Sequence, residues 1–143
     1  SRYESFFQQW SKERPDHIAT ALKFDESLGH RILAGSDMLL MPSRYEPCGL
    51  TQMYALKYGT VPIVRNIGGL KNSIQEFSDK TGKGNGFKFP NKKYFLKSLQ
   101  KALSCFNQTK TWEKLMRNGM GKDNSWECSA KQYSRLYQKI LRS

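Results

Sequence analysis

The chain has 143 residues, of which 38% are hydrophobic, so it is long enough for one domain with an apolar core and too apolar for a disordered segment. It has no apolar run of the roughly 20 residues that a membrane-spanning helix needs, so we expect no membrane partner. Its three cysteines are odd in number and widely spaced, which favours a reducing, intracellular setting over a disulfide framework or a zinc site. Since no cluster of acidic side chains is evident, we predict no metal site and no cofactor.

The positive charge is distributed unevenly along the chain. Nearly all of the formal net charge of +12 falls after residue 76, and a basic half is one feature of nucleic-acid-binding proteins. The lysines, however, stand among apolar residues at helical spacing, as in NKKYFLKSLQKALSCF (residues 91–106), and no nucleic-acid-binding motif accompanies them. We therefore expect no specific nucleic-acid partner, and a basic, non-enzymatic binding module remains the less favoured alternative.

Helical and strand patterns alternate along the chain. Helical spacing occurs at residues 2–15, 25–36, 49–59, 68–77 and in three segments after residue 91, broken near residues 107–109 and 121–124. Short apolar runs predict strands at residues 18–24, 37–42, 60–65 and 84–90. This order predicts an α/β fold in which a parallel sheet is covered by helices on both faces. Such sheets bind ligands where their strands end and the following helices begin.

The loop PSRYEPCGLTQ (residues 42–52) leads from one predicted strand into a helix. The first N–H groups of that helix, together with its dipole, form an anion site for which phosphate is the natural ligand. Gly49 permits close approach of a ligand to the backbone, and Thr51 adds a hydroxyl donor. The alternatives are that Gly49 only eases a tight turn and that Thr51 only caps the helix.

Glu46 adds a carboxylate next to this predicted anion site. A carboxylate repels a bare phosphate, so its position favours a ligand in which a neutral part rich in hydroxyl groups adjoins the phosphates. A sugar nucleotide has this composition. The alternative is a surface carboxylate paired with Arg44.

The stretch PSRYEPCGLTQMYALKYGTVPIVRNIGGL (residues 42–70) resembles the signature of the bacterial glycogen synthases and plant starch synthases. DESLGHRILAGSDMLLMPS before it and DNSWECSAKQYSRLYQKIL near the end are similar to the same family, so the resemblance covers the chain from about Phe24 onward. It implies a retaining glucosyltransferase that moves glucose from ADP-glucose, with UDP-glucose as the other possible donor, to the non-reducing end of an α-1,4-glucan. It also implies two Rossmann-like domains that face each other across a cleft, the GT-B arrangement.

The resemblance further implies which part of such an enzyme this chain represents. Residues 1–143 correspond to most of the second, nucleotide-sugar-binding domain, without its first strand and without the N-terminal acceptor domain. Residues 126–142 correspond to the terminal helix that crosses back to the acceptor domain, which is therefore an expected partner. We expect this chain alone to be inactive, and its location to be cytoplasmic, or plastidic in a plant or alga.

The site residues implied by the resemblance are Glu46, Phe24, Cys48, Gly49, Leu50, Thr51, Gly68 and Gly69. Glu46 matches the essential glutamate that holds the glucose hydroxyl groups, and Phe24 matches an aromatic residue against the base. The four residues from Cys48 to Thr51 match the loop and helix start around the glucose and the distal phosphate.

Two positions depart from the patterns of related enzymes. Ile67 stands where the glycogen synthase family has a threonine before its glycine pair, here Gly68 and Gly69. Tyr54 stands where other nucleotide-sugar transferases of this fold carry a second glutamate. The second departure argues against the alternative of a transferase that makes sucrose or a glycolipid.

Overall fold

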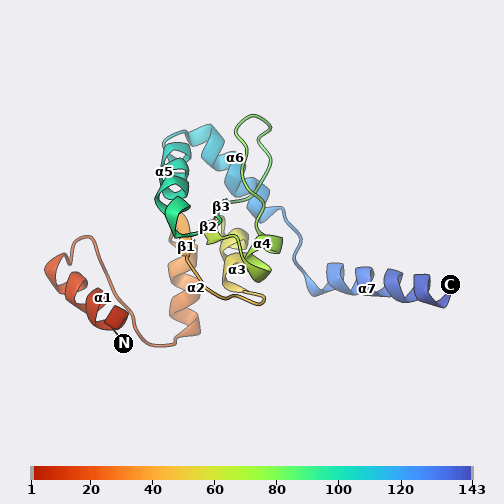
Figure 1. Cartoon of the computed structure of the whole chain (residues 1–143), viewed down its shortest axis with the longest axis horizontal. Coiled ribbons are helices and arrows are strands. Elements are labelled where there is room, and N and C mark those ends of the chain that lie inside the picture. The colour runs from red at the N-terminus through yellow and green to blue at the C-terminus, as the bar shows by residue number, and fades with distance from the viewer. Residues whose placement is uncertain (1, 143) are drawn as a thin grey trace.

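The computed structural model describes residues 2–142 and contains one parallel sheet (Figure 1). The sheet has the strand order β1 (Met38–Met41), β2 (Val61–Arg65) and β3 (Phe87–Phe89), with Met38 opposite Val61 and Ile63 opposite Phe87. The helices are α1 (Arg2–Glu13), α2 (Glu26–Ala34), α3 (Thr51–Tyr58), α4 (Gly68–Ser73), α5 (Phe95–Phe106), α6 (Thr109–Met120) and α7 (Trp126–Leu141), with a 3₁₀ turn, η1 (Lys92–Tyr94), before α5. The predicted α/β architecture is confirmed.

The central strand β2 is buried on both faces because alternate side chains of a strand point to opposite sides. Val61 and Ile63 face α5 and α6, where they join a buried cluster with Ala102, Cys105, Trp112, Leu115 and three phenylalanines, Phe77, Phe87 and Phe89. Val64 points the other way, into a cluster with Leu56 of α3, Leu70 of α4 and Ile74. The apolar run in β2 therefore reflects helices on both faces, as predicted.

The strand predicted at residues 18–24 is not formed. The chain between α1 and α2 is irregular there, and the side chains of Leu22 and Phe24 are exposed. In residues 2–142 the sheet ends at β1 and no strand lies beside this segment. A strand without a neighbour leaves its backbone N–H and C=O groups without a ladder, so an apolar pattern alone does not make it form.

Helices α1 and α7 stand away from the sheet (Figure 1), and neither has a buried residue. On α7, the side chains of Tyr133, Leu136, Tyr137 and Ile140 repeat at helical spacing and are all exposed. Among the helices described between residues 2 and 142, none combines the length and the apolar character required to cross a membrane.

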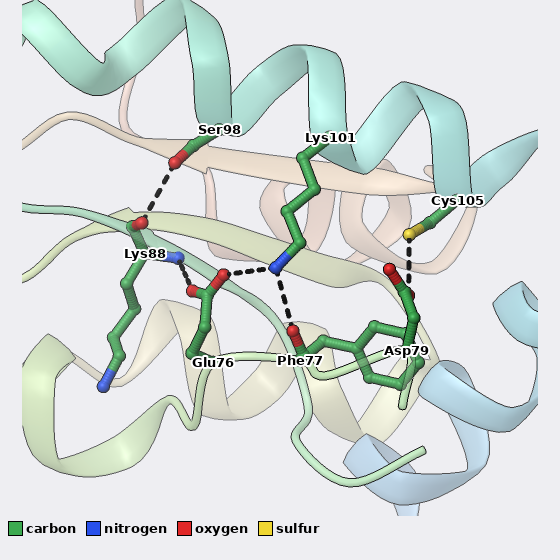
Figure 2. Close-up of polar contacts among 7 residues, drawn as sticks. All are labelled: Glu76, Phe77, Asp79, Lys88, Ser98, Lys101 and Cys105. Carbon is green, nitrogen blue, oxygen red and sulfur yellow. Dashed lines mark hydrogen bonds and ion pairs between the residues drawn. The ribbon is translucent and has the colours of Figure 1, made fainter. Parts of the chain in front are cut away.

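The segment between α4 and β3 is tied to α5 by the polar contacts that Figure 2 shows. Lys101 Nζ donates to Glu76 Oε1 at 2.8 Å and to the Phe77 carbonyl at 2.9 Å. The second oxygen of Glu76 accepts from the Lys88 N–H at 2.6 Å, and the Ser98 hydroxyl donates to the Lys88 carbonyl at 3.0 Å. Part of the basic half therefore serves to hold β3 against α5.

The thiol of Cys105 adds a further contact between α5 and the segment that precedes β3 (Figure 2). It is only 3% exposed, and its Sγ donates to Asp79 Oδ1 at 3.5 Å. Burial, together with the nearby Asp79 carboxylate, raises the pKa of the Cys105 thiol to about 11. This cysteine is therefore a neutral, packed side chain at neutral pH.

Candidate functional site

Two connections leave the carboxyl edge of the sheet from neighbouring strands. The loop of residues 42–50 joins β1 to α3, and residues 66–67 join β2 to α4. Because β1 and β2 are parallel and paired from Met38 to Met41, their ends meet at the same edge. This is the edge at which the sequence predicts a ligand.

The loop of residues 42–50 is in direct backbone contact with the second connection where this continues into the first two residues of α4, Gly68 and Gly69. The Gly69 N–H donates to the Glu46 carbonyl at 3.0 Å. A Cβ atom on Gly68 would collide with the Glu46 carbonyl, and one on Gly69 would collide with the Cys48 carbonyl. Gly68 also has a φ of +48°, in the left-handed region. The glycine pair is therefore required for the loops to touch, independently of the threonine that Ile67 replaces.

Gln52, which is not among the predicted site residues, joins the loop of residues 42–50 to α4. Its side chain is fully buried, and its Nε2 donates to the Gly49 carbonyl at 2.7 Å and to Ser73 Oγ at 3.0 Å. The Ser73 hydroxyl in turn donates to the Gly69 carbonyl at 2.7 Å. A polar residue in the first turn of a helix gives no sign of burial in the sequence, because its contacts include Ser73 of α4, which is 21 positions away.

Gly49 has two structural reasons to be a glycine. Its φ is +71°, and the position of a Cβ atom is occupied by the side-chain amide of Gln52. The tight turn considered in the sequence analysis is thus present. Close approach of a ligand to Gly49 stays a prediction.

The N-terminus of α3 is open. The helix begins at Thr51, and its N-cap residue, Leu50, supplies no side-chain hydrogen bond. Thr51 is exposed, and its hydroxyl caps nothing among residues 2–142, so the alternative in which Thr51 only caps the helix is wrong. Met53 N–H donates to the Leu50 carbonyl at 2.8 Å, whereas no acceptor among residues 2–142 is bonded to the N–H groups of Thr51 and Gln52, which are therefore available to an anionic ligand.

Glu46 lies in the loop that leads to this open helix end, five residues before Thr51, and is partly buried. Within the described part of the chain its carboxylate forms no ion pair, so the pairing with Arg44 considered above is not found. An unpaired carboxylate can accept hydrogen bonds from a ligand's hydroxyl groups, and its proximity to the α3 N–H groups stays a prediction. Among residues 2–142, no three His, Cys, Asp or Glu side chains gather as metal ligands would.

Phe24 stands apart from the other predicted site residues. Its ring is 98% exposed, which excludes a core role, and it immediately precedes the N-cap of α2, Asp25. The Asp25 side chain accepts from the Leu28 N–H at 2.9 Å, and this bond, with Lys23 nearby, lowers the pKa of Asp25. The role of Phe24 against the base of a nucleotide therefore stays a prediction.

Comparison with known proteins identifies one family and several similar proteins that carry the same name. The family described as glycosyl transferases group 1 matches residues 7–119. A glycogen synthase of Koribacter versatilis is 50% identical over 139 residues, which are 96% of this chain and 29% of that protein. A glycogen synthase of Pseudothermotoga lettingae is 49% identical over 144 residues, 99% of this chain and 30% of that protein. The chain therefore spans about 30% of the length of the curated relatives it matches.

Solved structures agree with these relatives. The catalytic domain of starch synthase IV from Arabidopsis thaliana, bound to ADP and acarbose, is similar with a TM-score of 0.82 and 37% identity, over 99% of this chain and 30% of that chain. A sucrose-phosphate synthase from Thermosynechococcus elongatus is similar with a TM-score of 0.68 at 22% identity, which supports the fold alone. The expected GT-B glycosyltransferase class of fold and the resemblance to glycogen and starch synthases are confirmed.

Proposed function

Since this chain belongs to the group 1 glycosyl transferases, we propose that it is the nucleotide-sugar-binding part of a glycogen or starch synthase. The enzyme transfers glucose from ADP-glucose to the non-reducing end of an α-1,4-glucan, with retention of configuration. UDP-glucose is the other candidate donor, and the ADP bound to the similar starch synthase favours the adenine nucleotide. A cytoplasmic or plastidic location accompanies this proposal.

One observation carries the proposal: a carboxylate without an ion pair, Glu46, lies in the loop that ends at the open N-terminus of α3. The free N–H groups of Thr51 and Gln52 suit the distal phosphate of a nucleoside diphosphate. The carboxylate suits the hydroxyl groups of the sugar attached to that phosphate. A phosphate alone would leave the carboxylate without a ligand group, and a sugar alone would leave the N–H groups without one.

The chemistry follows from these two groups. Departure of the diphosphate leaves negative charge on the distal phosphate, and fixed N–H donors at the α3 N-terminus stabilise that charge. Glu46 holds the glucose hydroxyl groups and so fixes the anomeric carbon relative to the acceptor. Retention then results from attack by the glucan hydroxyl on the same face that the diphosphate leaves, through an oxocarbenium-like state.

The remainder of the relatives' length accounts for the parts that transfer also requires. We assign residues 1–143 to the C-terminal nucleotide-sugar-binding domain and the acceptor site to a separate N-terminal domain. Residues 126–142 cross to that domain, which the exposed apolar stripe of α7 supports. The chain by itself is therefore expected to bind nucleotide but not to transfer glucose.

Nucleotide titration of this chain tests the proposal. We expect ADP to shift the amide NMR signals of Gly49, Leu50 and Thr51, with a dissociation constant around 1 mM, about −4 kcal/mol. AMP should bind more weakly because it lacks the phosphate that reaches the helix. Lys97→Met, which removes an exposed charge on α5, is the control and should leave both affinities unchanged. If ADP shifts only the lysines between residues 80 and 101, the phosphate site at α3 is wrong.

A further inference from the structure

We propose that Gln52 and Ser73 are positioning residues: together they set the place of the Glu46 loop relative to the start of α4 at Gly68 and Gly69. They touch the loops and not the donor itself. The role in transfer rests on the proposed function, because it assumes that these two loops hold the donor sugar and its phosphate.

The hydrogen bonds of the two side chains form a chain in which Gln52 donates to Ser73 and Ser73 donates to the Gly69 carbonyl. Gln52 Nε2 has two hydrogen atoms and three acceptors, namely the Gly49 carbonyl at 2.7 Å, Ser73 Oγ at 3.0 Å and the Cys48 carbonyl at 3.3 Å. The single hydroxyl hydrogen of Ser73 goes to the Gly69 carbonyl at 2.7 Å. Because Ser73 Oγ accepts from the Gln52 amide, the Ser73 hydroxyl does not donate to Gln52 and donates to the Gly69 carbonyl instead. Gln52 thus holds the loop before α3 and is bonded to Ser73, whose hydroxyl is bonded within α4 to the carbonyl of Gly69, four residues earlier.

The side-chain oxygen of Gln52, Oε1, indicates that this hydrogen-bond pattern does more than fill space. Gln52 Oε1 is buried and has no hydrogen-bond partner among residues 2–142. A buried acceptor without a donor lowers stability, and an apolar side chain of similar size would avoid that loss. Flipping the amide would turn the oxygen toward the Gly49 and Cys48 carbonyls, which accept only. The position therefore keeps an amide for its donors, at the expense of an unsatisfied oxygen.

Ser73 is itself held from the far side of α4. Lys122 Nζ donates to the Ser73 carbonyl, and burial of this lysine lowers its pKa. Asn85 Nδ2 also approaches the same carbonyl, at 3.5 Å. These contacts fix the backbone of Ser73 at the end of α4, so its hydroxyl is held in place as the acceptor for Gln52 Nε2.

Thr60 provides a matched control within the same sheet. Thr60 is 1% exposed and immediately precedes β2, at the end of the strand away from the two loops. Its hydroxyl contacts the carbonyls of Leu33 and Ser36. Thr60→Val therefore removes a hydroxyl donor to backbone carbonyls, as Ser73→Ala does, but not at the loops. Ser73→Thr, which keeps a hydroxyl, is the rescue variant.

Amide hydrogen exchange in this chain tests the inference without requiring catalysis. The probe is the Gly69 N–H, which donates to the Glu46 carbonyl between the loops. In Gln52→Leu and Ser73→Ala its exchange should accelerate about tenfold relative to the amides of β2, since a lost hydrogen bond allows local opening. Thr60→Val should change the Gly69 and β2 amides by the same factor, and Ser73→Thr should restore most of the Gly69 protection. ADP affinity should fall in the first two variants only.

Gln52→Glu is the second variant at position 52 in case Gln52→Leu does not fold, because it keeps the shape but loses both donor hydrogens. The inference is overturned if Gly69 exchange relative to β2 is unchanged in both Ser73→Ala and the folded position-52 variant. Failure of the unmodified chain to bind ADP would instead contradict the proposed function, and the exchange ratio at Gly69 would still decide whether Gln52 and Ser73 position the loops.

Discussion

The glycine at position 69 offers a sharp test of the contact between the two loops. In Gly69→Ala the new Cβ atom would overlap the carbonyl group and Cα of Cys48, which are backbone atoms and cannot rotate away. The loops must then separate or the backbone must distort. Overpacking of this kind lowers the free energy of unfolding by about 1–3 kcal/mol. For a chain of this length that corresponds to a fall in Tm of roughly 3–10 °C.

The same chemical change at Gly29 should have the opposite sign. Gly29 lies inside α2, and a Cβ atom there would meet nothing within 4 Å. Alanine in a helix interior is favoured over glycine by about 0.5–1 kcal/mol, because glycine has more freedom to lose on folding. Gly29→Ala should therefore raise Tm by a few degrees, about 1–4 °C.

Thermal and urea unfolding of the three proteins, followed by circular dichroism, measures both changes. The ADP titration should also show weaker binding for Gly69→Ala, because the loop that carries Glu46 is displaced, and unchanged binding for Gly29→Ala. If Gly69→Ala is as stable as the unmodified chain and its Cys48 amide signal does not move, the close contact between the loops is refuted.

Two further predictions concern single side chains. In a whole synthase that contains this sequence, Glu46→Gln should lower kcat at least about tenfold with little change in nucleotide affinity, since each hydrogen bond to a charged acceptor is worth about 1.5–3 kcal/mol; an unchanged kcat would make Glu46 a bystander. In the folded chain at pH 8, a thiol reagent should modify the exposed Cys48 and spare Cys105, whose pKa burial raises to about 11. Equal labelling of both cysteines would contradict the burial of Cys105. Because the Cys105 thiol ionises near pH 9 in the unfolded chain, its contribution to the free energy of unfolding should be complete below pH 9 and should disappear as the pH rises toward 11.

The local elements follow from local patterns in the sequence. Apolar runs at residues 37–42 and 60–65 have no alternation, and these segments are the strands β1 and β2 between layers of helices. The helices after residue 91 end near the predicted breaks, because a helix is defined by spacing within one segment. The loop with Glu46 and Gly49 could also be located from sequence, since it lies between a strand pattern and a helix pattern.

Contacts between distant segments were decided only by the tertiary structure. Residues 18–24 have a strand-like pattern but remain irregular, because a strand requires a neighbour and no pattern within the segment reports one. Gln52 looks like a surface residue until Ser73, 21 positions later, places a hydroxyl against its amide. Likewise, Gly68 and Gly69 are explained by the Glu46 and Cys48 carbonyls that a side chain would strike. Periodicity is a property of one segment, whereas the site depends on how two segments pack against each other.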